Sequence, residues 1–182
     1  MSPALKHGSL SRWRNDERGT AAVEFALVLP VLLILYLGGF EISKAVATYR
    51  KVTDTTVELA NVASQYTTMS AGDVATVMSA SAQIMAPYST APLTIVLSEV
   101  TTDASNHPTV TWSQPYNGAT PLAVGSAVNM PAGLASPSNN YLLVQTTYQY
   151  TPTVGSAYVH PIALSDEIYM IPRDSPSIPY TG

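Results

Sequence analysis

The strongest feature of the hydrophobic pattern is one apolar run near the N-terminus, residues 20–40. At a rise of about 1.5 Å per residue it forms a helix of about 31 Å, which matches the roughly 30 Å hydrocarbon core of a bilayer. Glu24 is its only charged residue, whereas a surface helix would have one polar face. The run therefore predicts a transmembrane helix, and the polar, basic residues 1–19 before it predict a cytoplasmic leader.

The helical spacing of apolar residues continues beyond this run without its uniform hydrophobicity. The positions that step by three or four residues are Ile42, Ala45, Val46, Tyr49, Val52, Thr56, Ala60 and Ala63. No Gly or Pro interrupts residues 41–70. This pattern predicts that the membrane helix continues as an amphipathic stalk over residues 41–68.

A second helix is predicted at residues 72–86. Ser70 and Asp73 have the spacing of a capping box, and Pro87 ends the helical pattern. The predicted apolar face is formed by Val74, Val77, Met78, Ser81, Ile84 and Met85.

Beyond this helix, apolar residues recur at every second position, which is typical of strands. Strands are predicted around Leu93–Leu97, around Val110–Trp112, at residues 141–151 and at residues 167–171. Residues 115–140 are rich in Gly and Pro and predict a long irregular loop. The pattern therefore predicts a folded domain over residues 69–182. It predicts an α+β fold for the chain, with a small antiparallel sheet of about four strands packed on the stalk.

Composition narrows the classes of function. Charged residues make up 11% of the chain, against about 25% in ordinary soluble domains. The basic residues before position 52 are Lys6, Arg12, Arg14, Arg18, Lys44, Arg50 and Lys51. Beyond them the chain is acidic, which argues against nucleic acid as a partner. The sequence contains no Cys, which excludes disulfides and thiolate metal sites.

The basic leader is the flank expected on the cytoplasmic side of a membrane helix. Lys44, Arg50 and Lys51 follow the span at a similar distance, so charge alone does not fix the orientation.

The most informative motif begins where the leader meets the apolar run, and its sequence is RGTAAVEFALVLP, residues 18–30. The leader ends in Gly19, and Glu24–Phe25 follow after four small or apolar residues. The Gly-x-x-x-x-Glu-aromatic arrangement resembles the processing site of Flp-type pilins in the type IV pilin superfamily. Residues 19–61 resemble the TadE-like segment of the tight-adherence (Tad) secretion and pilus system. The spacing of Glu24 from Gly19, the Leu-Pro that follows and Glu41 carry this resemblance together.

The resemblance implies a pilin-like protein with a structural function, a minor pilin or pseudopilin in the assembly or initiation of a Tad/Flp pilus. It implies cleavage between Gly19 and Thr20 by a prepilin peptidase. The implied partners are the membrane, other Tad pilus subunits and assembly-platform proteins, with no small-molecule substrate or cofactor. The implied location is the bacterial inner membrane, with a single pass and a periplasmic C-terminal domain.

Glu24 is the residue of the span whose chemistry needs an explanation. A carboxylate in a membrane helix is costly and usually has a partner. The resemblance implies that this partner is the Thr20 ammonium of a neighbouring subunit. Phe25, Pro30 and Glu41 are expected to contribute with Glu24 to helix packing and subunit recognition. Alternatively, Glu24 only reaches the lipid headgroups. Pro30 removes the hydrogen bond to the Ala26 carbonyl and predicts a kink, although membrane helices also tolerate proline.

Two other readings of the N-terminus stay open. Ala45-Val46-Ala47 has the A-x-A form of a signal-peptidase site, and cleavage after Ala47 would release a domain that starts at Thr48. The helix could also be an uncleaved signal anchor of a periplasmic protein.

The sequence does not support an enzyme. His7, His107 and His160 are the only histidines, and they lack metal-helix spacing. No G-x-S-x-G motif is present. Asp166 and Glu167 are adjacent in a predicted strand and therefore point to opposite faces. We expect no catalytic residue and no metal site.

Overall fold

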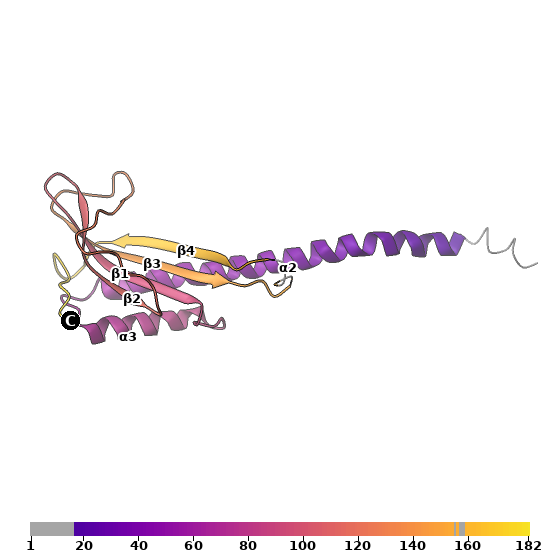
Figure 1. Cartoon of the computed structure of the whole chain (residues 1–182), viewed down its shortest axis with the longest axis horizontal. Helices are drawn as coiled ribbons and strands as arrows, with labels where there is room; N and C mark the ends of the chain where they lie inside the picture. The colour runs from indigo at the N-terminus through magenta and orange to yellow at the C-terminus, as the bar shows by residue number, and fades with distance from the viewer. Residues whose placement is uncertain (1–16, 155, 157–158) are drawn as a thin grey trace, which may run out of the picture. The chain divides into compact units, whose positions relative to one another are not determined.

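The computed structural model describes residues 17–154, 156 and 159–182. Most of the predicted leader lies outside the described residues. The described elements are two α-helices, a short 3-10 helix and four strands (Figure 1). The chain forms two compact units, residues 1–43 and 44–182, with the boundary inside the first described helix.

The helix α2 runs from Glu17 to Ala63 and includes the whole apolar run. It is the one helix among the described residues that is long and apolar enough to span a membrane, with a mean hydropathy of 2.3 in its most apolar window. No residue of that window is buried within the chain. Pro30 lies inside the helix, which continues past it.

In the second unit, the final part of α2 packs into the core with a face slightly different from the predicted one. Val52, Ala60 and Ala63 are buried as expected, whereas Val46 and Tyr49 are 46% and 42% exposed. Three fully buried threonines occupy much of the face that packs into the core: Thr56, as predicted, and Thr48 and Thr55, which the apolar pattern does not include. Their hydroxyls donate to carbonyl oxygens of the preceding turn, which explains how polar side chains fit an apolar interface.

The second helix, α3, runs from Ala71 to Ala82 and is followed by the 3-10 helix η1, Gln83–Met85. The predicted capping box is confirmed: Ser70 Oγ accepts from the Asp73 N–H, and the Asp73 carboxylate accepts from the Ser70 N–H at 2.9 Å. The Ser70 hydroxyl, which also donates to the Asp73 carboxylate at 2.6 Å, and then the Ser70 N–H lower the pKa of Asp73. The buried residues of α3 include Val74, Val77 and Met78, as predicted.

The four strands form one antiparallel sheet in the order β2-β1-β3-β4. Their bounds are Leu93–Thr102 for β1, Pro108–Tyr116 for β2, Asn140–Tyr150 for β3 and Ile162–Met170 for β4. In the second unit, α3 and the final part of α2 lie along the sheet (Figure 1), and side chains from helices and strands share one hydrophobic core. The predicted α+β fold is therefore confirmed.

The connection between β2 and β3 is more ordered than its Gly and Pro content suggests. Pro115 and Tyr116 still belong to β2. Residues further along form hydrogen bonds with the sheet: Tyr141 Oη accepts from the Ser136 N–H and donates to the Leu134 carbonyl. Tyr141 is 1% exposed, so this loop covers one part of the outer sheet face.

Candidate functional site

All six predicted site residues lie on α2. Glu24 follows Thr20 by one helical turn, so their side chains lie on the same side of the helix. Glu41, by contrast, lies seventeen residues after Glu24, or about 26 Å along the axis. The structure therefore arranges these residues along one helix and does not bring them together in a cluster.

Gly19 has no packing role within the chain. A Cβ added at this position would meet no heavy atom within 4 Å. Glycine in a helix is also less favourable than alanine by up to about 1 kcal/mol. The fold itself therefore does not require glycine at position 19.

The side chains of the span face outward. Phe25 is 61% exposed, and Leu27, Ile34 and Tyr36 are at least 70% exposed. Glu24 is exposed among them, while Glu41 is partly buried and has an interaction partner. So much exposed apolar surface on one helix needs lipid or other helices to cover it.

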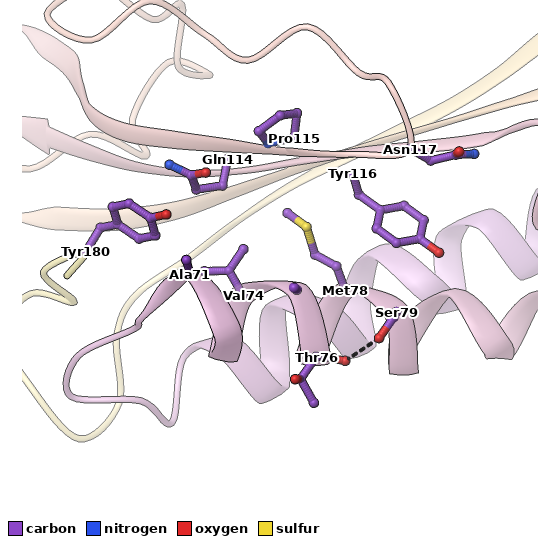
Figure 2. Close-up of a pocket in the computed structure, with 11 residues that line it drawn as sticks. Ala71, Val74, Thr76, Met78, Ser79, Gln114, Pro115, Tyr116, Asn117 and Tyr180 are labelled. Carbon is purple, nitrogen blue, oxygen red and sulfur yellow. Dashed lines mark hydrogen bonds between the residues drawn. The ribbon is translucent and has the colours of Figure 1, made fainter. Parts of the chain in front are cut away.

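A recess of about 570 Å³ lies in the second unit, between α3 and the end of β2 (Figure 2). Met78 of α3 points toward Tyr116 of β2, Val74 lies below Gln114, and Tyr180 of the C-terminal tail lies at one end. Its titratable side chains are these two tyrosines, and its lining includes no His, Asp, Glu or Lys that could activate Thr76 or Ser79 as a nucleophile.

The two histidines among the described residues, His107 and His160, lie in separate connections. His107 Nδ1 lies 3.3 Å from an Asp103 carboxylate oxygen in the exposed turn between β1 and β2. The backbone N–H of His107 is the main reason why the pKa of Asp103 is lowered. His160 is exposed in another connection. Among the described residues, no group of three His, Asp or Glu side chains could hold a metal ion.

Sequence reasoning missed one buried polar cluster, which we call the tail latch: Glu99, Trp112 and Ile178. Glu99 is 2% exposed, and its carboxylate accepts from the Ile178 N–H at 2.7 Å and from Trp112 Nε1 at 3.0 Å. Trp112 Nε1 also donates to the Ile178 carbonyl, at 2.8 Å. Two neighbouring strand side chains therefore bind both backbone polar groups of one tail residue.

The tail latch holds the C-terminal segment against the core. Ile178 is fully buried, and Met69 pairs with the tail through hydrogen bonds to Pro179 and Thr181. Burial raises the pKa of Glu99, while the hydrogen bonds from Ile178 and Trp112 oppose that shift. The only sequence signal was an acidic residue, Glu99, in phase with the apolar positions Leu93, Ile95 and Leu97.

Comparison with known proteins adds one result. No curated protein and no solved structure matches the chain significantly. The model of the family described as TadE-like protein matches residues 19–61. This match contains Gly19, Glu24, Pro30 and Glu41, the residues on which the sequence resemblance rests. Residues 19–61, about a quarter of the chain, are therefore similar to the TadE-like family.

Proposed function

We propose that the chain is a minor pilin or pseudopilin that acts in the assembly or initiation of a Tad/Flp type IV pilus. The observation that carries this proposal is the TadE-like match at residues 19–61. This match supports an association with Tad pili. The more specific role, as a subunit of the pilus itself, is supported by Gly19 and Glu24, which have the spacing of a pilin processing site.

The exposed apolar helix gives this role a physical mechanism. Its side chains are not covered by the chain itself. Lipid covers them while the subunit is stored in the inner membrane, and other helices replace the lipid during assembly. In a water-free helix bundle Glu24 needs a positive partner, and the Thr20 ammonium of a neighbouring subunit supplies it.

Cleavage after Gly19 creates this ammonium. Because Gly19 is not needed for packing, its presence fits the demands of a peptidase, whose narrow active site admits a residue without a side chain. An α-amino group has a reference pKa of about 7.7–8.0 and is mostly protonated at neutral pH. The alternative is an uncleaved single-pass protein of the same system, in which Glu24 finds a different partner.

The signal-peptidase alternative is less consistent with the structure. Ala45 packs against the core of the second unit, and Lys44 Nζ donates to Thr153 Oγ1 at 2.8 Å. Cleavage after Ala47 would remove both residues from the folded unit. We therefore propose that residues 44–182 remain attached to the membrane helix and lie in the periplasm.

A complementation experiment tests the proposed function. A strain that lacks this chain should lose most of its Tad pili, counted by electron microscopy, and the full chain should restore them. The double variant His107→Gln/His160→Gln should restore them equally well, because no described site uses either histidine in chemistry. Normal piliation in the deletion strain would contradict the proposal, and failure of a stable double variant would reopen the question of catalysis.

A further inference from the structure

The connection between β3 and β4 lies beside the part of α2 that enters the second unit. Lys44 Nζ donates to Thr153 Oγ1 at 2.8 Å. Tyr150, the last residue of β3, pairs with Ile162, the first residue of β4. The end of the β3–β4 hairpin is therefore held close to Lys44.

This end of the hairpin exposes large apolar side chains. Val154, Val159 and Ile162 are 40%, 44% and 47% exposed, and we call these three residues the hairpin patch. Val46, two residues beyond Lys44 on α2, is exposed to a similar degree. These side chains belong to one short connection and to the first residue of the strand that follows it. Several large exposed apolar side chains within one such segment indicate an interaction surface.

The position of Lys44 in the chain indicates which partner covers the hairpin patch. Lys44 follows Phe40, the last residue of the apolar run, by four residues in the same helix. Four residues rise about 6 Å in a helix and reach at most about 14 Å when extended. The headgroup layer on each side of a bilayer is about 5–8 Å thick. Lys44 therefore lies at or near headgroup depth.

We propose that the hairpin patch inserts into the membrane surface, at the boundary between headgroups and acyl chains. This inference rests on the membrane-anchor part of the proposed function. Valine and isoleucine side chains suit the apolar side of that boundary, and the Lys44 ammonium suits its polar side. The second unit then has two attachments to the bilayer, α2 and the hairpin patch, which together limit its rotation about the helix axis.

Single-cysteine labelling can test this directly, because the chain contains no native Cys. Full-length V154C, V159C and I162C carry a nitroxide and are placed in nanodiscs of phosphatidylethanolamine and phosphatidylglycerol. Power-saturation EPR compares collisions with oxygen, which is enriched in lipid, and with a water-soluble nickel chelate. The controls are L33C, within the span, and V124C, which replaces a side chain that is 72% exposed in the β2–β3 connection.

We expect the hairpin labels to collide with nickel several-fold less often than the V124C label and to lie at a shallower depth than the L33C label. Adding Val159→Asp should return the I162C label to nickel accessibility, whereas adding Leu134→Asp should not. Hairpin labels as accessible as V124C, together with a protected L33C label, would overturn the inference and leave the anchor intact. An accessible L33C label would overturn the anchor and the inference together.

Discussion

Glu24→Leu should insert into the membrane at least as well as the natural chain and yet support few pili. Insertion depends on apolar length, and a carboxylate opposes it. Assembly is different, because Glu24 would pair with a positive group in a dry helix bundle. Removing one member of a buried ion pair commonly costs about 3–5 kcal/mol, which corresponds to a loss of association of at least about a hundredfold. The variant should therefore accumulate in the inner membrane.

Three readouts define this experiment: pilus counts, the amount of chain in the inner membrane, and the amount of chain in sheared pili. Glu24→Asp keeps the charge and should retain part of the assembly, whereas Glu24→Gln keeps the shape without the charge and should fail. Val31→Leu, on the same exposed helix, controls for a general change in the span. Normal piliation by a stable Glu24→Leu chain would show that Glu24 only reaches the headgroups.

Glu99→Ala should destabilise the second unit more than any change of a surface carboxylate. It leaves the Ile178 N–H without an acceptor and removes one of the two acceptors of Trp112 Nε1. A buried donor without an acceptor costs about 1–3 kcal/mol, and the lost side-chain volume adds to that. Urea unfolding of the detergent-solubilised full chain measures the change, and hydrogen exchange shows whether residues 174–182 open first.

Glu167→Ala is the matched control, because Glu167 is exposed on the outer sheet face and its carboxylate accepts from Gln145 Nε2. Its effect should stay within about 0.5 kcal/mol, as for most surface changes. Equal stability of the two variants would contradict the structural importance of the tail latch.

The pH dependence gives a second check on the tail latch. Burial raises the pKa of Glu99 above its ordinary value of 4.5. Between that value and the raised one, the folded state binds more protons than the unfolded state, so the contribution of Glu99 to stability falls as pH rises. Glu99→Ala should remove this fall in the free energy of unfolding above pH 4.5. Glu167→Ala should still show it.

The helices could be predicted from the sequence because their signals are local. The apolar run defines the first part of α2, the absence of Gly and Pro from residues 41–70 marks its continuation, and Ser70 and Asp73 mark the start of α3. The packed face of α2 was partly mispredicted, because Thr48 and Thr55 are buried with their hydroxyls satisfied inside the helix. Hydrophobicity alone gives no hint of that arrangement.

Long-range features could not be predicted in the same way. The strand β4 begins at Ile162, five residues before the predicted start, because its first half is held by pairing with β3 and buries little apolar surface. The tail latch joins Glu99 to Ile178, which lies 79 residues later in a Pro-rich segment without a period. The six predicted site residues on α2 came from the motif, and the roles proposed for them depend on partners outside the chain.

The mature N-terminus is the most direct test of the central claim, that this is a processed, pilin-like subunit with residues 44–182 outside the cytoplasm. Intact-mass analysis and N-terminal sequencing of the membrane-extracted protein from its native host would determine it. We predict a chain that starts at Thr20, which requires the leader to have faced the prepilin peptidase on the cytoplasmic side. A chain that starts at Met1 or Ser2 would contradict processing and indicate an uncleaved anchor, and a start at Thr48 would contradict membrane attachment altogether.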